Sequence, residues 1–209
     1  MTTYLDVFSK KYSLNIKGIV HVGAFDGQEL GNYVENGVKN IVMFEPLSQS
    51  YSKLEQNLQS LTLDETYDVE IHQVALGNMV GRVDINLSSN MMSSSILKPK
   101  LHLVEHPWCA FGGVENVSIN KLDSYKYKKF NFLNIDVQGY ELEVLKGAKK
   151  TLKYIDYIYS EVNKAEVYEN NALIDDMDEF LSQYNFIRVE TDWCDGASWG
   201  DAFYIKKLN

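Results

Sequence analysis

The chain has 209 residues, of which 45% are hydrophobic and 12% aromatic, a composition that excludes a disordered chain, collagen and a coiled coil. Its 20 Lys and Arg against 29 Asp and Glu give a net charge of −9, and because this charge repels phosphates we expect no nucleic acid as the main partner. Two widely separated cysteines, no signal sequence and no apolar run of about 20 residues indicate a cytoplasmic protein without a membrane span.

Short apolar runs alternate with amphipathic stretches, which predicts an α/β fold with helices on both faces of a mostly parallel sheet. We expect strands at residues 18–22, 40–44, 69–74, 130–135, 157–162, 186–190 and 202–206. We expect helices at residues 28–35, 49–60 (capped by Ser48), 139–152 and 172–184. The last two strands are predicted to form an antiparallel pair at the edge of the sheet.

An insertion at about residues 78–122 separates the third expected strand from the fourth. Within it, residues 81–87 and 117–122 alternate in polarity as strands do. The loop between them carries more apolar surface than a disordered segment has: Met91, Met92, Leu101, Leu103, Trp108 and Phe111. Because long loops in compact domains are commonly functional, we expect a single domain, residues 1–209, with this insertion as a lid for substrate recognition.

Ligands of doubly wound sheets bind outside the carboxyl ends of the strands, so the residues at these ends are the first candidates for a site. They are small, amide or acidic residues, without Lys or Arg: Gly23, Ala24, Asp26 and Gly27 after the first strand, Glu45 after the second, Val74 and Ala75 after the third, Asp136 after the fourth, and Glu161 and Asn163 after the fifth. Such a set suits a cationic or neutral ligand better than a phosphate.

The first of these turns distinguishes between nucleotide cofactors. A dinucleotide needs the pattern G-x-G-x-x-G, because its pyrophosphate approaches the backbone at a helix N-terminus. The turn here is GAFDG, residues 23–27, in which Asp26 would repel a pyrophosphate. S-adenosylmethionine fits better, since it carries an adenosine without phosphates, a sulfonium and an ammonium. Glu45 follows Gly27 by 18 residues, close to the about 20 residues expected for an acid that binds ribose hydroxyls.

Three regions together resemble the FkbM-type methyltransferase family, which uses S-adenosylmethionine and has a Rossmann-like fold. They are IVHVGAFDGQE at residues 19–29, VALGNMVGRVDINL at 74–87 with SINKLDSY at 118–125, and FLNIDVQGYELEVLKGA at 132–148 with IYSEVN at 158–163. The resemblance covers residues 18–163 and implies a class I methyltransferase domain. It also implies O-methylation of a sugar, a glycan or a glycosylated natural product.

The resemblance also assigns places to individual residues: the methionine tail of the cofactor at Gly23, Ala24 and Gly27, the ribose at Glu45, the adenine at Val74 and Ala75, and the reacting centre at Asp136. One position departs from the family, which usually has an acid two residues before the first glycine, where this chain has His21. Asp26 or Asp136 could replace that acid in binding the ammonium group of the cofactor.

Transfer of a methyl group to a hydroxyl needs in-line alignment and a base that removes the hydroxyl proton. Asp136 is our first candidate for the base and Glu161 the second, because neighbouring acids raise one another's pKa. Asp136, Glu161 and Asn163 could also converge as oxygen ligands of a divalent cation such as Mg²⁺, an alternative that we favour less.

The candidate substrate contacts lie in the lid: Ser94, Ser95, His106, Trp108 and Phe111. The two aromatic side chains offer flat faces to a sugar ring, and the serines offer hydrogen bonds to its hydroxyls. The alternative is that Trp108 and Phe111 only attach the lid to the sheet. We expect a small-molecule or glycan acceptor. A catalytically inactive scaffold or regulator that binds the cofactor is the alternative function, and His21 is the feature that favours it.

Overall fold

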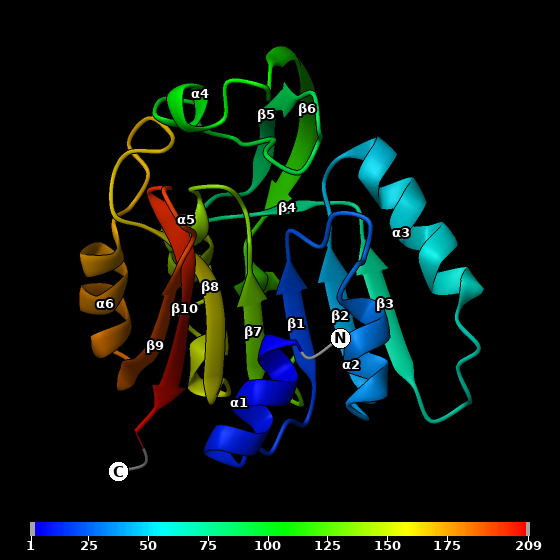
Figure 1. Ribbon diagram of the computed structural model, residues 1–209. Coiled ribbons are helices and arrows are strands. Elements are labelled where there is room, and N and C mark those ends of the chain that lie inside the picture. Colours follow the sequence, from blue (N-terminus) through cyan, green and yellow to red (C-terminus); the bar gives the residue numbers. More distant parts are fainter. Residues whose placement is uncertain (1–2, 208–209) are drawn as a thin grey trace.

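The computed structural model describes residues 3–207, so the first two and last two residues of the expected domain lie outside it. Its larger sheet has seven strands in the order β3-β2-β1-β7-β8-β10-β9 (Figure 1). Their bounds are β1 Ile19–Val22, β2 Asn40–Phe44, β3 Asp68–His72, β7 Phe132–Ile135, β8 Tyr157–Asn163, β9 Phe186–Trp193 and β10 Trp199–Lys206. Strand β10 is antiparallel to both of its neighbours, β8 and β9, and the other strand pairs are parallel. The predicted mostly parallel sheet with an antiparallel edge is therefore confirmed.

A second, three-stranded sheet stands beyond the carboxyl ends of the parallel strands, at the top of Figure 1. Its order is β4-β6-β5, with β4 Ala75–Leu76, β5 Gly81–Ser88 and β6 Phe111–Asn120. The strands β5 and β6 are antiparallel, and β4 is parallel to β6. The short helix α4, His102–Glu105, lies in the chain between β5 and β6. The insertion thus forms an ordered structure over the edge at which ligands of such sheets bind.

Helices cover both faces of the larger sheet: α1 Tyr4–Tyr12, α2 Leu30–Glu35, α3 Ser48–Ser60, α5 Glu141–Lys146 and α6 Ile174–Ser182, with 3₁₀ turns at Leu122–Ser124 and Thr151–Lys153. Successive strand residues point to opposite faces. Ile19 packs with residues of α1, α2 and α3, whereas Val20 packs with residues of α5 and α6. The central strands β1, β2 and β7 are mostly apolar and almost entirely buried, because helices cover both faces of the sheet there. None of the helices in residues 3–207 has the length and apolar character needed to cross a membrane.

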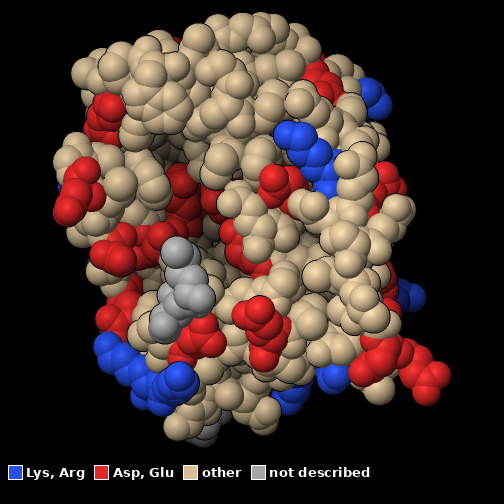
Figure 2. Space-filling view, turned by 45° about the vertical axis from the view of Figure 1, so that its right-hand side comes forward, with Lys and Arg blue, Asp and Glu red and all other residues tan. Residues whose placement is uncertain are grey.

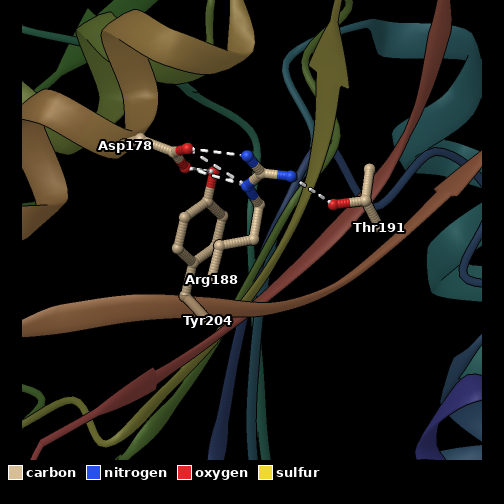
Figure 3. A network of polar contacts seen from close by, with 4 residues as sticks. All are labelled: Asp178, Arg188, Thr191 and Tyr204. Carbon is tan, nitrogen blue, oxygen red and sulfur yellow. Dashed lines mark hydrogen bonds and ion pairs between the residues drawn. The ribbon is translucent and has the colours of Figure 1, made fainter.

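A polar network attaches α6 to the antiparallel edge of the sheet (Figure 3). Arg188 of β9 donates to the carboxylate of Asp178 on α6, with Nη2 and Oδ2 2.8 Å apart. The hydroxyl of Tyr204 on β10 donates to the other oxygen of Asp178 at 2.9 Å, and Arg188 also donates to Thr191 at 2.6 Å. One carboxylate thereby joins a helix and two strands, at the end of the sheet away from the glycine turn.

Three local predictions were wrong or incomplete. Helix α1 was not predicted; it begins with a capping box in which Thr3 N donates to Asp6 Oδ2 at 2.9 Å. Ser48 does not cap α3 but is its first residue, and its N–H donates to Glu115 at 3.0 Å. The helix expected over 139–152 is shorter, Glu141–Lys146. The residue after it, Gly147, lies so close to another segment that a Cβ there would be 2.0 Å from the Gly77 carbonyl oxygen.

Candidate functional site

The order of the strands reverses at β1, which pairs with β2 on one side and with β7 on the other. Such a switch point opens a crevice at the carboxyl ends of the two strands. Gly23 follows β1 with a φ of +84°, and a Cβ at this residue would lie 1.7 Å from the carbonyl oxygen of Asp136 after β7. Only glycine fits both the left-handed backbone and this close approach. The two strand ends are therefore held directly against each other.

A cavity of about 210 Å³ occupies this crevice. Most of the residues predicted to bind the cofactor line it: Gly23, Ala24, Glu45, Val74, Ala75 and Asp136. Asp26 and Gly27 lie instead toward α3: the Asp26 carbonyl accepts from Asn57 at 2.7 Å, and a Cβ on Gly27 would meet Leu54 at 2.6 Å. The family usually has an acid at the position of His21, and Asp26 and Asp136 were the two candidates to replace it. Of these two, only Asp136 lines the cavity.

Glu45 is buried at the end of β2 and directs its carboxylate into the glycine turn. One oxygen accepts from the N–H of Phe25 at 2.9 Å, and the other accepts from the N–H of Leu47 at 2.8 Å. Burial raises the pKa of Glu45 to about 8, against the lowering effect of the two hydrogen bonds. Each oxygen keeps a lone pair for a further donor. The side chain is thus a fixed acceptor at the wall of the cavity.

The structure brings Asp136 and Glu161 together through a residue that the sequence analysis missed, Gln138. Its Nε2 donates to Asp136 Oδ1 at 2.7 Å and to Glu161 Oε2 at 2.8 Å. Asp136 is accessible from the cavity, but the surrounding protein withdraws it from bulk water and raises the pKa of its carboxyl. Burial, and then the charge of Asp136, raises the pKa of Glu161 well above its ordinary value. Two acids with raised pKa values therefore share one amide group.

His21 and Glu29 also line the first cavity. His21 Nδ1 lies 3.2 Å from the hydroxyl of Tyr33, which accepts from Asn134 at 2.7 Å. Burial lowers the pKa of His21 to about 4, so the imidazole is neutral at pH 7. Burial raises the pKa of Glu29. Glu29 follows the glycine turn by two residues and lies in the first turn of the predicted helix. This position could have identified it as a candidate site residue from the sequence.

A second cavity, of about 280 Å³, adjoins the first. Met92, Asp136 and Gln138 line both cavities. Among the predicted substrate contacts, His106 and Trp108 line the second cavity and Ser94 and Ser95 the first, while Phe111 packs edge-on against His102 with ring centroids 5.2 Å apart. The candidate catalytic acids Asp136 and Glu161 both line the second cavity. The carboxyl pair thus lies where the two cavities meet.

The predicted lid residues have different surroundings. Trp108 is 68% exposed and lines the second cavity, which favours a contact with a ligand over attachment of the lid to the sheet. The Ser95 hydroxyl donates to the Gln138 carbonyl at 2.6 Å, and Ser94 Oγ accepts from the N–H of Ser88 at 3.0 Å. His106 accepts from the indole of Trp199 at 3.2 Å. The two serines therefore hold the loop in place over the first cavity.

The three residues predicted as metal ligands, Asp136, Glu161 and Asn163, have different surroundings. Asn163 is 1% exposed, lines neither of the two cavities, and its side-chain atoms find no hydrogen-bond partner within the described chain. Across residues 3–207, no three His, Cys, Asp or Glu side chains gather closely enough to hold a metal ion. The oxygens of Asp136 and Glu161 that face each other are occupied by the amide of Gln138.

The electrostatic character of the site is acidic. Of the described residues that line the two cavities, none is Lys or Arg, whereas Glu29, Glu45, Asp136 and Glu161 all are acids. Figure 2 shows acidic side chains in the depth of a hollow on one face of the molecule. Such a lining offers no cation to a phosphate, and its carboxyls favour a ligand with positive charge when they are ionised.

Comparison with known proteins finds relatives of this chain in sequence and in fold. The model of the "Methyltransferase FkbM domain" family matches residues 21–188. The 2-O-methyltransferase NoeI of Sinorhizobium fredii is 28% identical over 191 residues, covering 83% of this chain and 76% of that protein. A solved FkbM methyltransferase from Methylobacillus flagellatus has a TM-score of 0.63 at 17% identity; 90% of this chain matches it and spans 43% of its length. The Streptococcus pneumoniae protein Sp1610, "a putative tRNA (m1A22) methyltransferase", solved with S-adenosyl-L-methionine, matches with a TM-score of 0.55 at 14% identity, over 100% of this chain and 76% of its own.

Proposed function

Because this chain belongs to the FkbM methyltransferase family, we propose that it transfers a methyl group from S-adenosylmethionine to a hydroxyl oxygen of a sugar, either free or part of a glycan or glycosylated product. The observation that carries the proposal is the pair of adjoining cavities that meet at Asp136 and Gln138. One cavity has the features of a site for a cationic nucleoside, and the other is open to an acceptor. The membership in the family itself makes the chain a methyltransferase.

The residues of the first cavity fit S-adenosylmethionine, which supplies a methyl group bound to a sulfonium. The free lone pairs of the Glu45 carboxylate are suited to the two ribose hydroxyls. Gly23 and Ala24 present backbone without bulky side chains, as the methionine tail requires. Glu29 provides an acidic side chain for the ammonium group, beside the neutral His21. Val74 and Ala75 form an apolar wall on which an adenine can lie.

Asp136 is suited to the role of base and Glu161 to that of second candidate. Asp136 lines both cavities, so it can contact an acceptor hydroxyl next to the cofactor. With S-adenosylmethionine held at Gly23, Ala24 and Glu45 to supply the methyl group, the Asp136 carboxylate would take the proton of the acceptor hydroxyl. A raised pKa brings a carboxyl closer to the working pH, where general bases are most effective. Well-placed bases contribute about 100- to 10,000-fold to a rate.

The second cavity and the insertion support a neutral sugar as the acceptor. Trp108 offers an exposed flat face at this cavity, and Asn90, Ser93 and Glu161 offer hydrogen-bonding groups. The absence of Lys and Arg from the described lining disfavours phosphorylated acceptors and nucleic acid. The name of NoeI, a 2-O-methyltransferase, supports oxygen as the methylated atom. We propose that the insertion acts as the lid, since Ser94, Ser95 and Trp108 all belong to it.

The test is methyl transfer with labelled S-adenosylmethionine and a panel of acceptors: neutral sugars, the matching sugar phosphates and a catechol. We expect release of S-adenosylhomocysteine with at least one neutral sugar, and the position of the methyl group is then read by NMR. The Asp136→Asn variant is the matched negative control. Turnover on catechols or sugar phosphates alone would refute the sugar acceptor. Binding of the cofactor without turnover on any acceptor would favour an inactive cofactor-binding scaffold, as His21 suggests.

A further inference from the structure

Gln138 lies at the junction of the two cavities, and its side-chain amide joins three functional groups. Its Nε2 donates to Asp136 and Glu161 at 2.7 and 2.8 Å, while its Oε1 is 2.8 Å from the hydroxyl of Tyr168. An amide NH₂ has two hydrogens, one for each carboxylate. We propose that Gln138 is a positioning residue, oriented by Tyr168, that holds Asp136 and Glu161 at a fixed spacing for proton transfer by donating a hydrogen bond to each. This inference rests on the proposed function for the roles of the two acids.

The orientation of the amide follows from its neighbours. Tyr168 is fully buried, and its single hydroxyl proton lies within reach of Gln138 Oε1 at 2.8 Å and of the Ser93 carbonyl at 2.9 Å. The reverse orientation would place the amide oxygen against two carboxyl oxygens, which is repulsive unless both carboxyls are protonated. With ionised carboxyls, Nε2 must therefore face Asp136 and Glu161.

The backbone of Gln138 supports a functional explanation for this residue. Its φ is +56°, a left-handed conformation that residues other than glycine adopt at a cost and that persists only where the surroundings enforce it. The Ser95 hydroxyl donates to its carbonyl at 2.6 Å. Glu141 accepts from the N–H groups of Val137 and Gly139, on either side, at 3.1 and 3.0 Å. The lid and the start of α5 thus hold the turn that points the amide at the acids.

The electrostatic surroundings show why such a donor is needed. The titratable groups that influence the pair come from every neighbouring element: His21, Glu29, Glu45, Glu141, Tyr159, Tyr168 and Asp201. All but His21 are acids or phenols, and His21 is neutral at pH 7. Withdrawal from bulk water by the surrounding protein raises the pKa of both carboxyls, whereas the hydrogen bonds from Gln138 lower the pKa of each. Removal of the amide should therefore raise both pKa values further.

The test compares the wild-type protein with Gln138→Met, which keeps the length of the side chain but removes the amide. The exposed Gln56→Met on α3 is the matched control. We follow the carboxyl carbons by ¹³C NMR against pH, with Asp136→Asn and Glu161→Gln to assign the two signals. We expect Gln138→Met to raise the titration midpoints of the remaining carboxyls by about one pH unit, as the loss of a hydrogen bond to a charged group predicts. The acid limb of kcat should move in the same direction.

Tyr168→Phe is the second variant, in case Gln138→Met does not fold. It removes the donor that orients the amide, so we expect a smaller shift in the same direction. Unchanged midpoints in both variants would overturn the proposal, even if their thermal stability falls, because a purely structural role changes stability alone. Shifted midpoints in a protein that methylates no sugar would support the positioning role and count against the proposed function instead.

Discussion

Removal of the Glu45 carboxylate tests the proposed cofactor site most directly. Its oxygens already accept from Phe25 and Leu47, so the carboxylate cannot swing away and its free lone pairs face the cavity. A hydrogen bond to a charged group contributes about 1.5–3 kcal/mol, and about 1.4 kcal/mol corresponds to a factor of ten in affinity. We therefore expect Glu45→Ala to weaken the binding of S-adenosylhomocysteine about 10- to 100-fold, as measured by calorimetry. The exposed Glu55→Ala on α3 is the matched control.

The pKa of Glu45, about 8, adds a pH dependence with a defined sign. Ribose hydroxyls donate to the ionised carboxylate, so the affinity for S-adenosylhomocysteine should increase as the pH rises toward and through this value. In the protein without ligand, the raised pKa contributes stability that is fully present below the unfolded value of 4.5 and is lost as the pH rises through about 8. Glu45→Gln should flatten both pH dependences. An affinity that is unchanged in Glu45→Ala, or equally pH-dependent in Glu45→Gln, would refute the ribose assignment.

Three further predictions concern the base, the lid and the turn. Asp136→Asn should lower kcat at least about 100-fold, the lower end of the contribution of a general base, while the affinity for S-adenosylhomocysteine changes much less; a parallel loss of both in kinetics and calorimetry would make Asp136 a cofactor ligand only. Trp108→Ala should raise the acceptor KM and leave the melting temperature nearly unchanged, because this side chain is 68% exposed; a large drop in melting temperature would show that it attaches the lid. Gly23→Ala should destabilise the fold by several kcal/mol, about 3 or more, through strain and overpacking, since its Cβ would lie 1.7 Å from a carbonyl oxygen. Gly37→Ala, also at positive φ but in open space, should cost only about 1 kcal/mol in the same thermal unfolding measurement.

The sequence alone determined the central sheet and the edge at which the site lies. The strands β1 and β7 are short and mostly apolar, each with one polar residue, because they are buried on both faces, and this signal does not depend on distant contacts. The glycine turn after β1 and the acid after β2 were readable from local sequence, since both follow directly from strand ends. The elements that were missed or misjudged depend on distant contacts. Helix α1 is ordered by stacking of Phe8 on Phe203, with ring centroids 4.6 Å apart, and α5 ends before Gly147, which lies against Gly77.

Only the tertiary structure decided which acids lie together and what joins them. The strand order places Asp136 and Glu161 near the ends of neighbouring strands. Their common donor, Gln138, reaches both because its backbone is left-handed, which the local sequence did not predict. Tyr168 reaches that turn from a loop 30 residues further along the chain. The predicted substrate contacts in the lid also differ in their surroundings. Ser95 donates to the carbonyl of Gln138 in the turn, whereas Trp108 lines the second cavity. Periodicity and turn residues report the conformation of neighbouring residues, whereas hydrogen bonds between distant segments form only after the strands have taken their order.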